Sequence, residues 1–197
     1  MKVYRIEKAN PKRVPFGREK DIYALFKAMP QVLEKPTLFR LLYMNKGPEK
    51  GPDFVAVNKK GHLLLGEIKN RSFRIDGWTQ AKRYAKRFSK MREDELDIEL
   101  CKVRAGTSVR RAVKGFLDPT AKRALLNPSR RKLQIVLVAE RFSDKVLRRT
   151  HRKDLGAPLK SKVKDVKCIE VQTFAVPQAA KFAVAAVISG KRRKLRR

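Results

Sequence analysis

Three charged residues lie in a stretch whose other residues have the composition of two buried β-strands. In GPDFVAVNKKGHLLLGEIKN (residues 51–70), Asp53 precedes the first apolar run, and Glu67 and Lys69 end the second. A buried carboxylate destabilises a fold by several kcal/mol unless it is paired with a cation or bound to a metal. The three residues therefore either lie at exposed strand ends or form a site.

The types of these three residues indicate hydrolysis of a phosphodiester. Asp53 and Glu67 offer carboxylate oxygens, which are the ligands that Mg²⁺ prefers. Side chains alternate along a strand, so Lys69 projects from the same face as Glu67, where it can orient or deprotonate a metal-bound water or stabilise a phosphate. Pro-Asp followed by Glu-x-Lys is a common pattern, however, and solvated charges at strand ends are the alternative interpretation.

The elements around these residues must position them, and a hairpin does so most directly. DFVAV and HLLLGEI flank the tight polar connection NKKG, which predicts two adjacent antiparallel strands over residues 53–57 and 62–68. Another strand is expected over residues 37–44. Before it, apolar residues at i, i+3, i+4 and i+7 over residues 22–29 predict a helix that ends at Pro30.

The chain after the hairpin is expected to alternate between helices and strands. Asp76 is the expected N-cap of a helix that runs to about Met91. The apolar run KLQIVLVAE at residues 132–140 predicts a central strand, Ser143 the N-cap of a further helix, and the alternating residues 166–174 another strand. The packing face of the helix after the hairpin is expected to comprise Trp78, Ala81, Ala85 and Phe88.

The composition combines an exceptional charge with an ordinary hydrophobic fraction. Fifty Lys and Arg residues against nineteen Asp and Glu residues give a formal net charge of +31, whereas 42% of the 197 residues are hydrophobic. That fraction argues for one folded domain and against a wholly disordered basic chain. A strongly positive field attracts polyanions, and counterion release makes nucleic acid the expected partner, although an anionic membrane surface would satisfy the same physics.

The domain organisation is expected to include basic segments on either side of the core. We expect a basic N-terminal arm over residues 1–16, a folded domain over residues 17–174 with a basic helical insert at about residues 92–131, a C-terminal helix over residues 175–189 and a basic flexible tail over residues 190–197. The start of the chain has no apolar targeting segment, and the longest apolar stretch is too short to span a bilayer. We therefore expect a cytoplasmic protein of a prokaryotic or viral system, with no membrane partner.

The insert is the expected contact surface for phosphates. Between residues 102 and 132, Asp118 is the only acidic residue, whereas an ordinary solvated face would carry more acids. Lys and Arg side chains of such a surface bind the DNA backbone mainly without reading bases. The residues expected to bind nucleic acid are Arg104, Arg110, Arg111, Lys114, Arg130, Arg131 and Lys132.

Several of these residues resemble the signature of the PD-(D/E)XK nuclease superfamily. PD at residues 52–53 and EIK at residues 67–69 look like its two conserved elements. Gln80 and Tyr84, in WTQAKRYAKRF, resemble the QxxxY motif on the helix that follows the catalytic strands of RecB-like nucleases. The i, i+4 spacing puts both side chains on one helix face, where they can meet the acidic site or the DNA backbone.

The similarity is closest to the catalytic domain of NucS/EndoMS-type endonucleases. Blocks in the same order cover residues 17–91 and 132–174, and Glu19 matches the glutamate of that family's first helix. The resemblance implies an α/β fold with a restriction-endonuclease-like α-β-β-β-α-β core, in which helices flank a mixed central sheet. The basic helical insert would interrupt this core.

The resemblance also implies the roles of the site residues. Asp53, Glu67 and the carbonyl of Ile68 would hold Mg²⁺ or Mn²⁺, and Glu19 would bind the metal directly or through water. Lys69 would be the base that orients the water or the phosphate. The attack of an activated water on phosphorus would leave a 5′-phosphate.

The sequence therefore predicts a Mg²⁺-dependent deoxyribonuclease, an endonuclease that hydrolyses phosphodiester bonds. Branched, mismatched or otherwise structured DNA, as met in repair or recombination, is the expected class of substrate. Cutting both strands calls for two sites and favours a homodimer, with residues 182–189 as a candidate interface or, alternatively, as part of the domain's own packing. The competing hypothesis is a non-catalytic basic protein that binds DNA or RNA and retains a nuclease-like fold.

Overall fold

The computed structural model describes residues 12–14, 39–45, 51–102, 106–150, 154–176 and 179–189, with side chains described for those between 39 and 171. The predicted helix over residues 22–29, Glu19, Arg104 and the tail over residues 190–197 lie outside the described residues.

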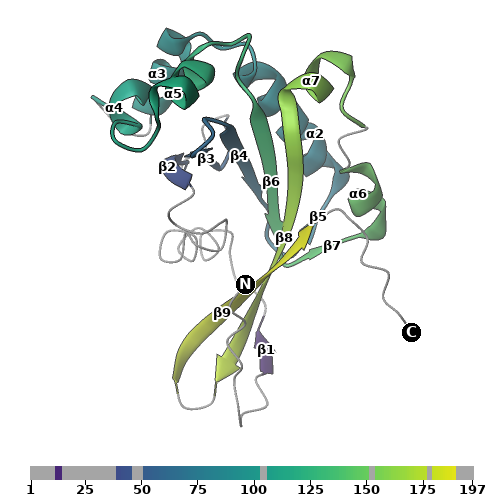
Figure 1. Ribbon diagram of the computed structural model, residues 1–197. Helices are drawn as coiled ribbons and strands as arrows, with labels where there is room; N and C mark the ends of the chain where they lie inside the picture. Colours follow the sequence, from purple (N-terminus) through teal and green to yellow (C-terminus); the bar gives the residue numbers. More distant parts are fainter. Residues whose placement is uncertain are drawn as a thin grey trace.

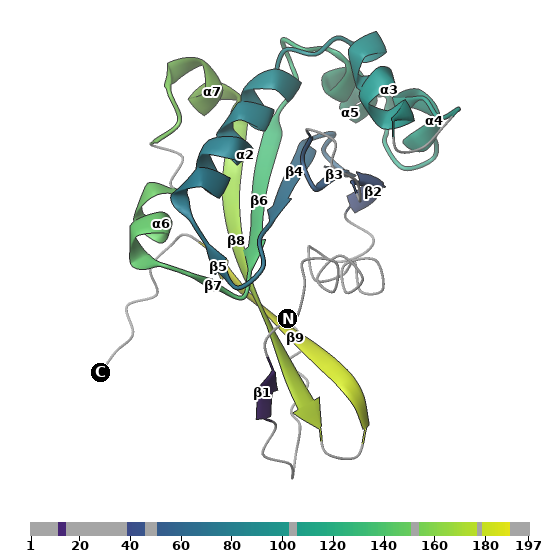
Figure 2. The same cartoon turned by 180° about the vertical axis from the view of Figure 1, so that it is seen from behind.

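The described residues form an α/β fold around a mixed sheet (Figures 1 and 2). The strands of this sheet are β1 Lys12–Val14, β2 Phe39–Met44, β3 Phe54–Asn58, β4 Leu63–Ile68, β6 Leu133–Ala139, β8 Val163–Val176 and β9 Ala179–Ser189. The five central strands combine an antiparallel meander, β2-β3-β4, with the parallel strands β4, β6 and β8. Strands β1 and β9 each pair antiparallel with β8, which gives the order β1-β8-β6-β4-β3-β2 with β9 also on β8.

The predicted hairpin is confirmed by β3 and β4, whose antiparallel register pairs Phe54 with Gly66. The Asn58 side chain closes the turn, because its Oδ1 accepts hydrogen bonds from the main-chain N–H groups of Lys60 and His62 at 3.0 Å each. A β-carbon at Gly66 would lie 1.9 Å from the Phe54 ring. The glycine before Glu67 therefore lets this large aromatic ring lie across the strand pair.

Helix α2 (Ile75–Phe88) packs on one face of the sheet, over β4 and β6 (Figure 2). Its buried face includes the four predicted residues, Trp78, Ala81, Ala85 and Phe88, all of them less than 5% exposed. The predicted N-cap is wrong by two residues, since Arg74 occupies the cap position. Asp76 lies in the first turn instead, where its Oδ1 accepts a hydrogen bond from the Gly77 N–H at 2.8 Å.

The elements that follow the insert agree with the predicted order. Strand β6 is central and buried along its whole length. Ser143 is the N-cap of α6 (Asp144–Arg149), as predicted, and its Oγ accepts a hydrogen bond from the Val146 N–H at 3.3 Å. A short helix that the sequence did not predict, α7 (Ala157–Lys162), then leads into β8.

A second, two-stranded sheet lies beyond the ends of β4 and β6. Strands β5 (Ser72–Phe73) and β7 (Arg141–Phe142) pair in parallel. The rings of Phe73 and Phe142 stack with their centroids 5.2 Å apart. The chain that leaves β4 and the chain that leaves β6 are thereby held side by side.

The prediction of a C-terminal helix over residues 175–189 is wrong. Strand β8 contains the predicted strand over residues 166–174 and continues to Val176, and β9 pairs with it antiparallel from Lys167↔Ser189 to Val176↔Ala179 (Figure 1). Short apolar runs such as FAVAAVIS fit a buried helix or a strand equally well by periodicity. A neighbouring strand with unpaired backbone groups favours the second arrangement.

The insert is helical, as predicted, and consists of α3 (Glu93–Cys101), α4 (Val109–Ala112) and α5 (Pro119–Leu126). It contacts the turn of the β3–β4 hairpin. A β-carbon on Gly61, whose φ is +72°, would lie 2.2 Å from the Ala121 carbonyl oxygen. The Lys59 Nζ donates to the Phe116 carbonyl at 3.0 Å, and the Arg40 guanidinium lies 4.9 Å from the Phe116 ring centroid.

Both faces of the central sheet are buried, which explains the nearly continuous apolar runs of its strands. Val55 and Leu65 belong to the core on the side of α2, whereas Ala56 and Leu64 belong to a second cluster on the other face. Among the described residues, no helix is long and apolar enough to cross a membrane.

Candidate metal centre

The ends of β3 and β4 that lie away from the hairpin turn bring the three charged residues together. Asp53 directly precedes β3, and Ile68 is the last residue of β4. Asp53 Oδ2 accepts a hydrogen bond from the Ile68 N–H at 2.5 Å, and the Asp53 N–H donates to the Gly66 carbonyl at 2.9 Å. The Asp53 carboxylate is therefore held against the main chain between Glu67 and Lys69.

Glu67 is a buried acid, so the interpretation of solvated strand-end charges is wrong for this residue. Its side chain is 1% exposed, and its Oε1 lies 2.6 Å from the Nζ of Lys69, which is 29% exposed. A carboxylate at this depth requires a cation, because desolvation would otherwise cost several kcal/mol. The Lys69 ammonium therefore neutralises the Glu67 carboxylate, while the Lys69 side chain remains partly accessible to solvent.

Gln80 and Tyr84 lie on one face of α2, as their spacing predicted, and they contact each other. The Gln80 Nε2 donates a hydrogen bond to the Tyr84 Oη at 2.7 Å. Tyr84 is 8% exposed and belongs to the core cluster that includes Val55 and Leu65, whereas Gln80 is half-buried. Tyr84 therefore lies in the core on the buried face of α2, the helix that packs on β4, and its hydroxyl accepts the hydrogen bond of the Gln80 amide.

A third acidic ligand is not identified within the described part of the chain. There, no group of three or more His, Cys, Asp or Glu side chains is arranged to hold a metal ion. Glu19, which the family resemblance implied as a ligand, lies outside the described residues. Sequence reasoning did not single out Glu140, which is 8% exposed and directly follows β6, the strand beside β4. The sequence signal that could have identified Glu140 is its position at the end of the most apolar run, KLQIVLVAE.

The residues of this site fit Mg²⁺ or Mn²⁺ by the type of their donor atoms. Mg²⁺ is usually held by one or two carboxylates and several waters. Asp53 and Glu67 supply two carboxylates, linked through the main chain of Ile68. A carboxylate can accept roughly four hydrogen bonds, so the contacts to Ile68 and Lys69 are compatible with a metal-ligand role. A metal at this site would have Asp53 and Glu67 as its ligands.

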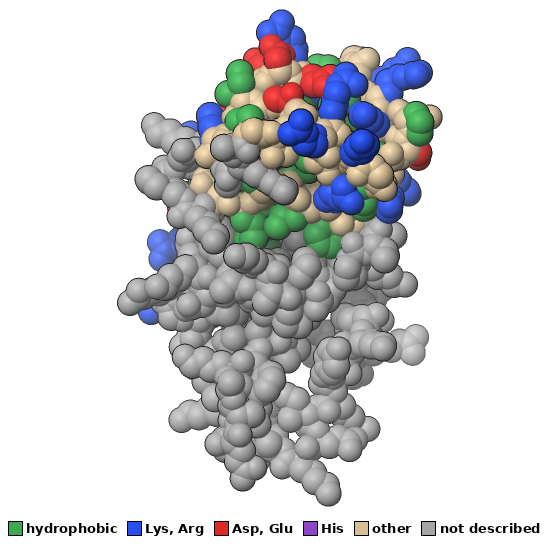
Figure 3. All heavy atoms as spheres, turned by 90° about the vertical axis from the view of Figure 1, so that its left-hand side faces the viewer, with side chains coloured by type: hydrophobic (Ala, Val, Ile, Leu, Met, Phe, Trp, Pro, Cys, Tyr) green, Lys and Arg blue, Asp and Glu red, His purple; other side chains and the backbone are tan. Residues whose placement is uncertain are grey.

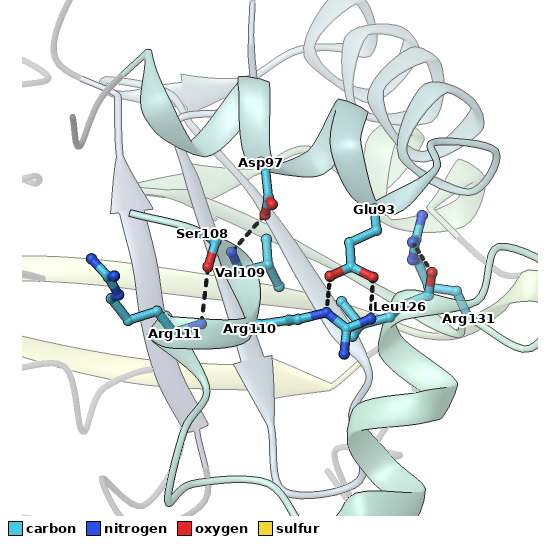
Figure 4. A network of polar contacts seen from close by, with 8 residues as sticks. All are labelled: Glu93, Asp97, Ser108, Val109, Arg110, Arg111, Leu126 and Arg131. Carbon is cyan, nitrogen blue, oxygen red and sulfur yellow. Dashed lines mark hydrogen bonds and ion pairs between the residues drawn. The ribbon is translucent and has the colours of Figure 1, made fainter. Parts of the chain in front are cut away.

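The basic residues of the insert differ in how they are held. Lys and Arg side chains gather on the face that the insert forms, with acidic side chains beside them (Figure 3). Arg111, Lys114 and Arg130 are exposed, as a phosphate contact requires. Arg110 instead pairs with both carboxylate oxygens of Glu93, Nε with Oε1 and Nη2 with Oε2, the second at 2.6 Å (Figure 4). The acidic residues of α3 therefore neutralise part of the positive charge of the insert, for which residues 102–132 offer only Asp118.

The prediction that Arg131 binds nucleic acid is wrong, because its side chain is fully buried. Its guanidinium donates to carbonyl oxygens, at 2.6 Å to Leu125, 2.9 Å to Phe88 and 2.6 Å to Met91. A fourth hydrogen bond reaches the Leu126 carbonyl at 3.3 Å (Figure 4). Burial lowers the pKa of Arg131 from its ordinary value to about 10. This arginine holds the start and the end of the insert together.

Lys132, the remaining predicted contact, is half-buried, and its Nζ donates to the Ser161 carbonyl at 3.2 Å. It therefore links the start of β6 to the end of α7 rather than standing free on the insert surface.

Comparison of this chain with protein-family models, with curated protein sequences and with solved structures found no match.

Proposed function

We propose that this protein is a metal-dependent DNA endonuclease of the PD-(D/E)XK type. The observation that carries the proposal is the contact of the Asp53 carboxylate with the Ile68 N–H, since it joins two acids and a lysine at one end of a hairpin. The order β2-β3-β4-α2-β6, with β4 and β6 parallel, is consistent with the β-β-β-α-β portion of the expected core.

Each side chain of the site would have a separate role in catalysis. Asp53 and Glu67 would hold Mg²⁺ or Mn²⁺, with the Ile68 carbonyl and Glu19 as further ligands. The bound ion would polarise the scissile phosphate and lower the pKa of a coordinated water. Lys69, which reaches solvent while it neutralises Glu67, would donate to a phosphate oxygen or orient the water.

The remaining contacts would position the substrate. Gln80, held by the Tyr84 hydroxyl, would approach the acidic site or the adjacent DNA backbone. The exposed residues Arg111, Lys114 and Arg130 would bind phosphates of duplex, branched or mismatched DNA without reading bases. Such a substrate class belongs to repair or recombination, and cleavage of both strands would involve a homodimer.

Incubation with plasmid and branched DNA tests this proposal directly. We expect cleavage with Mg²⁺ or Mn²⁺, none with EDTA, and a loss of at least about 100-fold in Asp53→Asn and Lys69→Ala, which remove groups that act on the transition state. Lys60→Ala is the control for Lys69, because Lys60 is an exposed hairpin-turn lysine and the charge change is the same. If the wild type cuts nothing with any divalent ion, or Asp53→Asn cuts as fast as the wild type, the proposal fails.

The second candidate is a non-catalytic nucleic-acid-binding protein. The observation that favours it is the ion pair between Glu67 and Lys69, which neutralises the charge of the buried carboxylate without any metal. In that case DNA or RNA would bind with equal affinity in Mg²⁺ and in EDTA, and Asp53→Asn would leave both binding and DNA integrity unchanged.

A further inference from the structure

A basic pocket opens beside Lys69, at the end of β4. Its volume is about 390 Å³, and its lining includes Lys69, Arg71, Arg74 and Arg141 with a single acid, Asp76. We infer that this pocket binds a phosphate group of a nucleic-acid strand and thereby anchors the strand beside the candidate metal centre. The inference rests on the proposed function for the identity of the ligand as nucleic acid.

The main chain around the pocket holds the arginines in place. The N–H of Arg141 donates to the Arg71 carbonyl at 3.0 Å, where β5 and β7 begin to pair. The stacked rings of Phe73 and Phe142 belong to the next residue pair of the same two strands. Arg71 has a φ of +60°, a left-handed conformation that non-glycine residues adopt rarely and at a cost, mostly at functional sites. The pairing of β5 with β7 therefore holds in place the main chain that carries Arg71 and Arg141.

Three of the four cations of the pocket are not paired with an acid of the described residues, whereas the fourth, Lys69, is paired with Glu67. Arg71, Arg74 and Arg141 form no ion pair with any residue that the structure describes. The one acid, Asp76, is turned toward its own helix, where it accepts the Gly77 N–H at 2.8 Å. Three arginines elsewhere, Arg110, Arg92 and Arg87, each pair with an acid of α3.

Phosphate oxygens are the chemistry that fits such a pocket. A guanidinium binds two of them at once, in a fixed fork geometry that a lysine lacks. An internal phosphodiester carries one negative charge, and a terminal phosphate carries about 1.5 to 2 at neutral pH. A pocket beside α2 and α6 is less suited, because its lining holds two cations, Lys82 and Arg149, against Asp154.

The position of the pocket relative to the candidate metal centre gives it a role. Lys69 contacts Glu67 at 2.6 Å and also lines the pocket, so one side chain borders both. A phosphate in the pocket would therefore lie beside the phosphate to be cleaved, on the same strand. Held at this point, the strand could not slide along the site during the reaction.

Binding of fluorescent oligonucleotides in EDTA tests the pocket without cleavage. Each oligonucleotide is used with a 5′-hydroxyl, with a 5′-phosphate and with a 3′-phosphate, against the wild type, Arg71→Gln, Arg141→Gln and the control Arg148→Gln. Arg148 is an exposed arginine of α6 that does not line the pocket, so its variant loses the same charge. We expect Arg71→Gln and Arg141→Gln to weaken binding about tenfold and to reduce the salt slope by about one, whereas Arg148→Gln changes the affinity less than about twofold.

The pattern across oligonucleotides identifies the source of the phosphate. Equal weakening with all three ends supports an internal phosphodiester, whereas loss of a preference for one phosphorylated end supports a terminal phosphate. Arg71→Gln and Arg141→Gln variants that melt like the wild type yet bind like Arg148→Gln would overturn the inference. The assay measures binding in EDTA, without cleavage, so a failure of the catalytic proposal leaves the result interpretable.

Discussion

Replacement of Arg131 by methionine should lower the free energy of unfolding by about 3 kcal/mol. The guanidinium makes four hydrogen bonds to carbonyl oxygens of Phe88, Met91, Leu125 and Leu126. Hydrogen bonds of a charged group stabilise by at least about 1.5 kcal/mol each, or about 6 kcal/mol together. Burial lowers the pKa of Arg131 to about 10, a shift that corresponds to about 3 kcal/mol against the charged form. Methionine removes both contributions.

Equilibrium unfolding in urea measures this difference, and Arg130→Met is the matched control. Arg130 is exposed, so its replacement should change the free energy by less than about 0.5 kcal/mol. In Arg131→Met, limited proteolysis should also cut first within residues 92–130, because the two ends of the insert are no longer joined. Equal stability of the two variants would refute the assignment of a structural role to Arg131.

Two further predictions concern the turn of the β3–β4 hairpin. Gly61→Ala should destabilise the fold more than Gly106→Ala. Both glycines have φ near +70°, but of the two only the Gly61 β-carbon would meet a neighbour, the Ala121 carbonyl. Equal melting temperatures of the two variants would contradict the docking of α5 on the hairpin turn. Burial, aided by Lys164 and other lysines, lowers the pKa of His62 below 6.5, so the folded state favours the neutral ring. Stability should therefore be complete above pH 6.5 and fall as the pH falls below it, and His62→Gln should reduce this slope in urea unfolding between about pH 5 and 7. A slope unchanged by the substitution would show that other groups cause it.

Local chemistry made the hairpin and the helix cap predictable. The polar residues from Asn58 to Gly61 between two apolar runs indicate a turn without reference to the rest of the chain. Ser143 caps α6 through its own hydroxyl, which is again a contact within four residues. The predicted hairpin likewise allowed Asp53 to lie near Glu67, because the register of a hairpin fixes which residues face each other.

Contacts between distant segments were not predictable in the same way. Arg130 and Arg131 are neighbours of the same type, yet one is exposed and the other is fully buried against Phe88, more than forty residues earlier. Nothing local distinguishes them. Strand β9 differs from its predicted helix for a similar reason, since the pairing with β8 decides its conformation. The basic pocket also depends on a distant pairing, that of Arg71 with Arg141.

If the protein acts on DNA as proposed, the length of the β3–β4 hairpin would set the shortest duplex that reaches both the acidic residues and the insert. Gly61 contacts the insert at one end of β4, and Glu67 lies at the other. Six residues of strand, at about 3.3 Å each, separate them by about 20 Å. A duplex rises about 3.4 Å per base pair, so DNA lying along the hairpin would need about six base pairs to reach from the acidic end to the insert. Shorter duplexes would occupy one end or the other, and the footprint of the protein on DNA should show that minimum length.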